Sequence, residues 1–234
     1  MSECITSARM ASTRSVRVLC RGSRTRWPSI RLFFALFVAG VCLGTSAVAA
    51  PTLAGSSLVD ALRHGGYVLV MRHASSPFTV PEKSAADPAN TRLERQLDDT
   101  GRATAREMGQ AFRTLAIPIG ETDSSPTYRA RETVRLAGFS KARSVAELDE
   151  VEQGMGGQAN TKQAAWLRSR AREVPRPATN TIVVTHTPNI VGAFGDEAAQ
   201  IAAGEALVFH PDGKGGTELV GRIKIEEWPK LTHR

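Results

Sequence analysis

Residues 66–74 read GYVLVMRHA, a short apolar run that ends in an arginine and a histidine. The run is rich in valine and is entered from a pair of glycines, which is typical of a short strand buried on both faces. Arg72 and His73 follow at its carboxyl end. Residues 181–189, TIVVTHTPN, repeat this arrangement and place His186 directly after a second apolar run. Continuous apolar strands of this kind are typical of a parallel sheet that helices cover on both faces.

Helical segments separate and follow these strands. Apolar spacing and flanking turn residues predict three helices, one beginning near Thr100, one at 128–137 and one at 161–173. The chain is expected to close with a pair of strands at 206–209 and 219–225. The alternation of strands and helices predicts an α/β fold of three layers, α/β/α, around a mostly parallel sheet.

A third polar sequence lies between the two buried strands. Residues 124–133 read SSPTYRARET, a turn that opens a helix with Arg129 in its first turn. In open α/β sheets, ligands bind beyond the carboxyl ends of the strands. We therefore expect His73 and His186 to share one crevice.

Taken together, these sequences resemble the histidine phosphatase superfamily, which has the phosphoglycerate-mutase-like fold. The family's Arg-His-Gly signature appears at residues 72–74 with alanine in place of glycine. Its Ser-Ser-Pro-x-x-Arg-Ala helix start is matched by residues 124–130, and its second strand-end histidine by His186. The first histidine, the helix arginine and the second histidine occur in the family's order, spaced by 56 and 57 residues. The resemblance extends over residues 58–231.

The resemblance implies a set of catalytic roles that agrees with phosphate chemistry. A reacting phosphoryl group spreads its negative charge over three oxygens, and guanidinium groups bind such oxygens in pairs. Arg72 and Arg129 are therefore the expected phosphate-binding residues. His73 is the expected nucleophile, because a neutral imidazole can attack phosphorus and form a phosphohistidine that water later hydrolyses. His186 is the expected donor that stabilises charge, and Arg95 is a further candidate for the wall of the pocket.

The general acid is assigned by the resemblance alone. Residues 148–154, LDEVEQG, are similar to the Leu-x-Glu-x-x-x-Gly segment that supplies the proton donor in mutase-like members. Glu150 would then protonate the leaving alkoxide. The alternative is a solvated acidic turn, since four of the six residues 147–152 are acidic. The reserve candidates are Glu205 and acids of the expected loop at 74–97, such as Glu82 and Asp87.

Composition excludes several classes of function. Residues 1–49 hold 7 of the 30 lysines and arginines but one of the 23 acidic residues, so the remainder has a net charge of only +1. A broad nucleic-acid-binding surface is therefore not expected. All three cysteines also lie in residues 1–49, which excludes cysteine-based zinc sites, disulfides and cysteine nucleophiles elsewhere. No His/Asp/Glu set has ligand spacing and no phosphate-binding glycine loop occurs, so neither a metal nor a cofactor is expected.

The N-terminus has the three-region order of a secretory signal peptide. Residues 1–31 are rich in arginine and serine, residues 32–44 are uncharged and mostly apolar, and residues 47–49 form an A-x-A cleavage site. A membrane span needs about 20 apolar residues. Cleavage after residue 49 is expected to leave residues 50–234 as one phosphatase domain without a stable membrane span, located in the periplasm or secreted. An uncleaved signal anchor and a later start codon stay open.

The expected function is that of an exported bacterial phosphatase acting on a small phosphomonoester, such as a phosphorylated sugar. In the phytase-like branch of the family an acid directly follows the second histidine, but Thr187 stands there in this chain, which argues against a phytase-like mechanism. Two alternatives are a phosphohistidine-protein phosphatase and a non-catalytic phosphate-binding module. The sequence does not indicate the oligomeric state.

Overall fold

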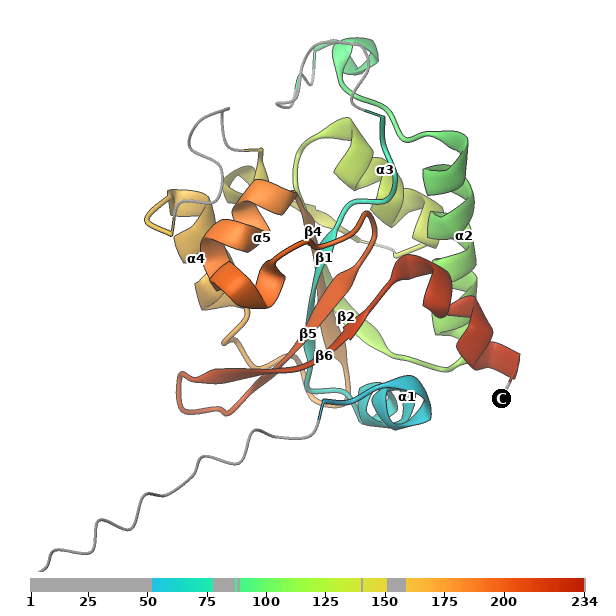
Figure 1. Cartoon of the computed structure of the whole chain (residues 1–234), viewed down its shortest axis with the longest axis vertical. Helices are drawn as coiled ribbons and strands as arrows, with labels where there is room; N and C mark the ends of the chain where they lie inside the picture. Colours follow the sequence, from blue (N-terminus) through green and yellow to red (C-terminus); the bar gives the residue numbers. More distant parts are fainter. Residues whose placement is uncertain (1–51, 78–86, 88, 140, 151–158, 234) are drawn as a thin grey trace, which may run out of the picture. The chain divides into compact units, whose positions relative to one another are not determined.

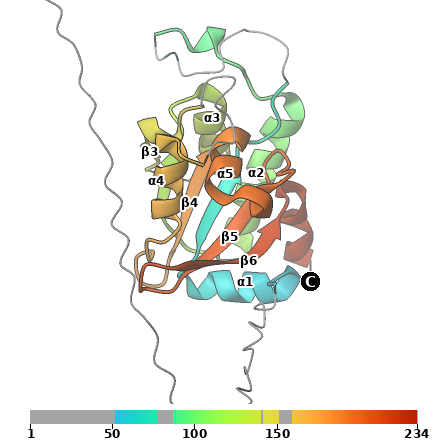
Figure 2. The same cartoon turned by 60° about the vertical axis from the view of Figure 1, so that its left-hand side comes forward.

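The computed structural model describes residues 52–77, 87, 89–139, 141–150 and 159–233 (Figures 1 and 2). These residues belong to one compact unit of the chain, Val48–Arg234. The expected signal peptide at 1–49 and the candidate acid Glu82 lie outside the described residues. Within the described part of the chain, no helix has both the length and the apolar character needed to cross a membrane.

A six-stranded sheet lies at the centre, in the order β3-β2-β4-β1-β5-β6. Its first four strands in that order are parallel, whereas β5 is antiparallel to β1 and β6 is antiparallel to β5. The expected α/β class with a mostly parallel sheet is therefore confirmed. The strands are β1 (Val68–Arg72), β2 (Ile119–Ser124), β3 (Arg143–Ser144), β4 (Asn180–Thr185), β5 (Ala206–Pro211) and β6 (Thr217–Ile223).

Helices cover both faces of this sheet (Figure 1). Alternate residues of β1 contribute to two separate apolar cores. Leu69 and Met71 pack on the face covered by α1, α2 and α3, and Val68 and Val70 pack on the face covered by α4 and α5. This division explains why the strand is apolar throughout its length. The helices are α1 (Gly55–His64), α2 (Asp99–Thr114), α3 (Tyr128–Ala137), α4 (Lys162–Arg170) and α5 (Thr187–Phe194).

The sequence analysis did not predict β2, and the structure gives the physical reason. The strand reads IGETDS and lacks an apolar pattern. Its buried Asp123 instead accepts hydrogen bonds from Arg170 Nε at 2.7 Å and from Arg143 Nε at 2.8 Å, and Glu121 also pairs with Arg170. Arg170 is the last residue of α4, which therefore ends three residues earlier than predicted. At β2, a network of ion pairs takes the place of apolar packing. Glu173 belongs to this network through its own ion pair with Arg170.

The register of the sheet brings three polar sequences to one edge. Arg72 lies beside Thr185 in the β1–β4 pair, and Ser124 lies beside Val184 in the β2–β4 pair. The next residue of each strand continues this alignment, because the His73 amide donates to the Thr185 carbonyl at 3.0 Å and the Ser125 amide donates to the Val184 carbonyl at 2.9 Å. His73, Ser125 and His186 therefore leave the sheet together at the carboxyl ends of neighbouring parallel strands.

Candidate active site

His73 is held with one ring nitrogen available for reaction. Its side chain is buried, with 1% exposure. The Nδ1 atom lies 2.8 Å from the carbonyl oxygen of Ala74. A carbonyl only accepts, so Nδ1 carries the hydrogen and Nε2 carries the lone pair. Arg95 Nη2 lies 3.3 Å from that Nε2 atom, so the unprotonated nitrogen faces a cation.

Three arginines surround this histidine with positive charge. Burial lowers the pKa of His73, and the charges of Arg129, Arg95 and Arg72 lower it further. Arg129 is fully buried in the first turn of α3, and burial, opposed by the charge of Glu150, lowers its pKa to about 10. The Nε atom of Arg72 and the Nε and Nη1 atoms of Arg129 are buried without a hydrogen-bond partner among the described residues. Buried donors are normally paired, so this group of donors fits an anionic ligand.

His186 lies at the end of β4, at the position that caps α5. Its Nδ1 atom is 3.2 Å from Arg129 Nη2, and its Nε2 atom is 2.9 Å from Ser125 Oγ. A guanidinium only donates, so Nδ1 accepts in this arrangement and Nε2 carries the hydrogen. In this tautomer, Nε2–H of His186 donates to Ser125 Oγ. The rings of His73 and His186 are 5.3 Å apart between centroids, as expected for residues that share a crevice.

Glu150 is brought into the same site. Its Oε2 atom lies 2.6 Å from Arg129 Nη2, its Oε1 atom lies 4.0 Å from His186 Nδ1, and its side chain is 15% exposed. Glu150 is therefore largely buried and paired, unlike the solvated acidic turn that was the alternative from the sequence. The reserve candidate Glu205 is engaged elsewhere, because it pairs with Arg222 Nε at 2.9 Å and accepts from the Ala202 amide at 2.8 Å.

Glu94 is a site residue that sequence reasoning missed. Its carboxylate is fully buried and accepts hydrogen bonds from the amides of Asp87 and Tyr128. Tyr128 begins α3, so Glu94 joins the segment that carries Arg95 to the helix that carries Arg129. Because a negative charge is favourable at a helix N-terminus, the Glu94 carboxylate also stabilises the start of α3. In the sequence, the only feature that pointed to Glu94 was its position next to Arg95, a candidate for the wall of the pocket.

Ala74 occupies the position where the family has glycine, and the structure accommodates it. Its backbone is outside the left-handed region that favours glycine. Its amide donates to Thr133 Oγ1 at 3.1 Å, and that hydroxyl donates to the Arg129 carbonyl at 2.8 Å. The residue after the expected nucleophile is thus tied to the helix that carries the expected phosphate-binding arginine.

Burial, followed by the charge of Arg129, lowers the pKa of both His73 and His186 well below the usual value. The unfolded chain therefore binds more protons than the folded chain below about pH 6.5. We expect the free energy of unfolding to be unaffected by these groups above that pH. As the pH falls below it, we expect a loss of up to about 1.4 kcal/mol per pH unit for each histidine.

Urea unfolding between pH 7.5 and pH 5 measures this effect. The control is the double variant His73→Asn, His186→Asn, whose stability should change less steeply over the same interval. Parallel curves for the two proteins would contradict the neutral state of the histidine pair.

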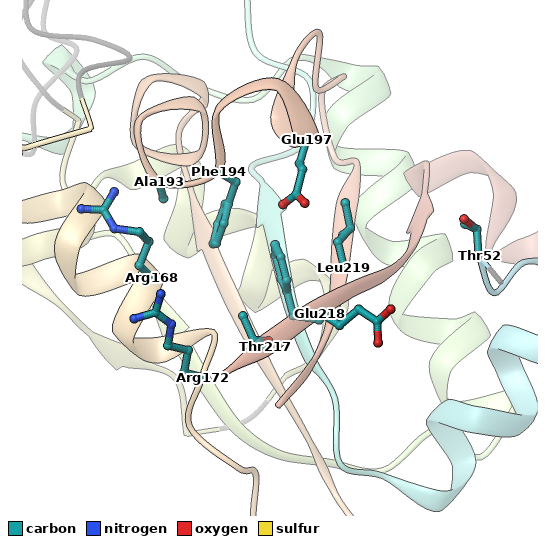
Figure 3. Close-up of a pocket in the computed structure, with 10 residues that line it drawn as sticks. Thr52, Arg168, Arg172, Ala193, Phe194, Glu197, Thr217, Glu218 and Leu219 are labelled. Carbon is teal, nitrogen blue, oxygen red and sulfur yellow. The ribbon is translucent and has the colours of Figure 1, made fainter. Parts of the chain in front are cut away.

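A separate pocket of about 550 Å³ lies between α5, β6 and the residues around the end of α4 (Figure 3). Arg168 and Arg172 lie on one side of it, and Glu197 and Glu218 lie on the other. None of the expected catalytic residues lines it. Arg168 donates to the carbonyls of Gly192 and Ala159.

No group of three or more potential metal ligands occurs among the described residues. The positive charge at the site around His73 comes from the side chains of Arg72, Arg95 and Arg129.

Comparison with known proteins identifies the family. The model of the histidine phosphatase superfamily (branch 1) matches residues 68–187, just over half of the chain. This chain therefore belongs to the histidine phosphatase superfamily. Curated proteins give no match by sequence.

Several solved structures are similar to this chain. The protein histidine phosphatase SixA complexed with tungstate has a TM-score of 0.51 and 19% sequence identity, covering 69% of this chain and 98% of that one. YhfR from Bacillus stearothermophilus has a TM-score of 0.47 and 13% identity, over 65% and 94% of the two chains. Phosphoserine phosphatase from Entamoeba histolytica, in complex with 3-phosphoglyceric acid, has a TM-score of 0.42 and 15% identity, over 61% and 89%. The likeness to the first of these supports the phosphoglycerate-mutase-like fold.

Proposed function

We propose that this protein is a phosphatase that hydrolyses a small phosphomonoester through a phosphohistidine intermediate on His73. One observation carries the proposal: the unprotonated Nε2 of His73 faces Arg95, close to Arg72 and Arg129, whose buried N–H donors have no partner within the described part of the chain. A nucleophile surrounded by cationic donors suits attack on a group that gains charge on its equatorial oxygens.

The first step transfers the phosphoryl group to the enzyme. Arg72, Arg95 and Arg129 bind the phosphoryl oxygens, and the Nε2 lone pair of His73 forms a bond to phosphorus. The ester enters as its monoanion, displaces the Glu150 carboxylate from Arg129 and gives it its proton. The bond from phosphorus to the ester oxygen then breaks, and the leaving alkoxide takes this proton from Glu150. Glu150 is paired with Arg129 at 2.6 Å, so an arriving phosphate competes with this carboxylate for the same guanidinium.

The second step regenerates the enzyme. The Glu150 carboxylate takes a proton from a water molecule, whose oxygen attacks the phosphorus of the phosphohistidine. The bond from phosphorus to Nε2 breaks, and its electron pair returns to His73. Inorganic phosphate leaves with the proton held by Glu150, and the Glu150 carboxylate pairs with Arg129 again, so each group of the enzyme is in its starting state.

A phosphorylated sugar is the substrate that we propose first, because an exported enzyme would meet such compounds outside the cytoplasm. The alternative of a phosphohistidine-protein phosphatase is supported by the likeness in fold to a solved protein histidine phosphatase, with a TM-score of 0.51. Assays with sugar phosphates and with a phosphohistidine peptide separate the two, since the better substrate has the higher kcat/KM.

Rapid-quench capture tests the proposed chemistry. We expect hydrolysis of 4-nitrophenyl phosphate together with a transient phosphate on His73 that acid removes and base retains. Phosphate that stays on His73 without turnover would favour the non-catalytic phosphate-binding module. Turnover without any captured phosphohistidine would contradict the proposed intermediate.

We also propose that the protein is exported by a signal peptide at residues 1–49 and acts in the periplasm or outside the cell. The support is the order of charged, apolar and small residues in the sequence. N-terminal sequencing of the exported protein is expected to begin at residue 50. An intact N-terminus in the cytoplasmic fraction would contradict export.

A further inference from the structure

Asn189 connects the second catalytic histidine to the segment that carries Glu150. It lies in the first turn of α5, three residues after His186, and is fully buried. Its Nδ2 atom lies 2.9 Å from the carbonyl oxygen of Asp149, 3.2 Å from that of Leu148 and 2.9 Å from Thr185 Oγ1. One amide nitrogen therefore faces three acceptors on two separate segments of the chain.

These contacts fix the backbone immediately before Glu150. The Asp149 carbonyl belongs to the same peptide unit as the Glu150 amide, which also donates to Asp149 Oδ1 at 2.8 Å. Thr185 Oγ1 donates to the Leu148 carbonyl at 2.9 Å and strengthens the connection from β4. The orientation of this peptide unit determines where the Glu150 side chain begins. Asn189 and His186 lie in the same turn at the start of α5, so these contacts set the position of Glu150 relative to His186 and Arg129.

The oxygen of the Asn189 side chain indicates that packing alone does not explain why an asparagine stands at this position. Its Oδ1 atom is buried without a hydrogen-bond partner among the described residues. A buried unpaired oxygen reduces stability, so the interactions of this side chain are concentrated at its nitrogen, which binds the backbone before Glu150.

We propose that Asn189 is a positioning residue for the general acid: it holds the peptide before Glu150 so that the carboxyl group reaches the leaving-group oxygen. The inference rests on the proposed function and on the acid role of Glu150. A displacement of about 1 Å of a reacting group can reduce a rate by about 100-fold. The loss should appear only where protonation of the leaving group limits the rate.

The test compares two esters that differ in their need for an acid. Asn189→Leu removes the donor with little change in size, and Asn189→Asp keeps the shape but replaces the nitrogen by an oxygen. We expect each variant to reduce kcat/KM for the alkyl ester β-glycerophosphate by about 10- to 100-fold. For 4-nitrophenyl phosphate, whose leaving group needs no proton, we expect a change of less than about 3-fold.

Asn180 supplies a matched control at the opposite end of β4. It is also fully buried, and its Nδ2 donates to the carbonyls of Leu62 at 2.7 Å and Pro118 at 3.0 Å, away from the catalytic residues. Asn180→Leu and Asn180→Asp should lower the melting temperature and affect the two esters equally. A variant of Asn189 is compared with the Asn180 variant of similar melting temperature.

A second comparison uses the Glu150→Gln background, in which Asn189→Leu should have almost no further effect on the alkyl ester. Equal losses on both esters for the Asn189 variants would overturn the inference while leaving the acid role of Glu150 intact, provided that Glu150→Gln alone is selective. If Glu150→Gln is not selective, both the acid assignment and the positioning role fail. If the wild-type protein hydrolyses neither ester, the proposed function itself fails.

Discussion

We expect the His73→Ala variant to lose phosphatase activity almost completely, with a fall in kcat of about 10⁴-fold or more for 4-nitrophenyl phosphate. The physical reason is that the variant lacks the Nε2 lone pair that forms the bond to phosphorus in the proposed mechanism. Steady-state hydrolysis measures the loss, and acid-labile phosphate should no longer be captured on the protein.

Two controls make this result specific. His210 is exposed and lies on β5, and the His210→Ala variant should retain wild-type activity. The His73→Ala variant should still bind sulfate, because the buried N–H donors of Arg72 and Arg129 are unchanged. A His73→Ala variant that both folds and retains a substantial rate would disprove the phosphohistidine mechanism.

The elements that carry the active site could be predicted because their patterns are local. The α3 helix begins after Pro126 and spans Tyr128–Ala137, as expected, and β1 and β4 are recognisable from apolar runs that pack on both faces. Since strand ends of a parallel sheet lie at one edge, the proximity of His73 and His186 also followed from the sequence pattern.

Other elements depend on contacts that no local pattern contains. The polar strand β2 is stabilised by Arg170, which lies 47 residues after Asp123 in the chain. The α5 helix has eight residues and begins directly after the strand-end histidine. Neither feature has a distinctive periodicity, which explains why the sequence analysis left both out.

The roles of individual side chains in the site were only partly predictable. Glu94 acts through the Tyr128 amide, 34 residues further along the chain, and only the folded structure brings the two together. The hydrogen-bonded tautomers of His73 and His186 likewise depend on Ala74 and Arg129. Residue type and order indicated which groups belong to the site, whereas the direction of each hydrogen bond required the three-dimensional arrangement.

We expect the Glu150→Gln variant to separate substrates by their leaving groups. Glutamine keeps the size of the side chain but has no proton to give, so an alkoxide must leave unprotonated. General acids contribute about 10²- to 10⁴-fold, and kcat/KM for β-glycerophosphate should fall by that range. The rate for 4-nitrophenyl phosphate should change much less, because nitrophenolate leaves without protonation.

The same variant should bind sulfate more tightly than the wild-type protein does. The Glu150 carboxylate lies 2.6 Å from Arg129. Glutamine carries no charge, so in the variant no carboxylate competes with sulfate for the Arg129 guanidinium. A solvated acid would show neither effect, so the pair of measurements separates a catalytic Glu150 from a structural one.

Glu205→Gln is the matched control for this prediction. Its carboxylate pairs with Arg222 and caps the Ala202 amide, so the variant should lose stability without distinguishing the two esters. If Glu205→Gln were selective for the alkyl ester and Glu150→Gln were not, the acid would be Glu205 and the Arg222 pair would have to open during catalysis. If neither variant were selective, the proton would come from water or from the segment around Asp87, whose amide is already bound to Glu94. In that case the carboxylate beside Arg129 would serve to balance charge in the site, and the tighter binding of sulfate by Glu150→Gln would be the only effect to persist.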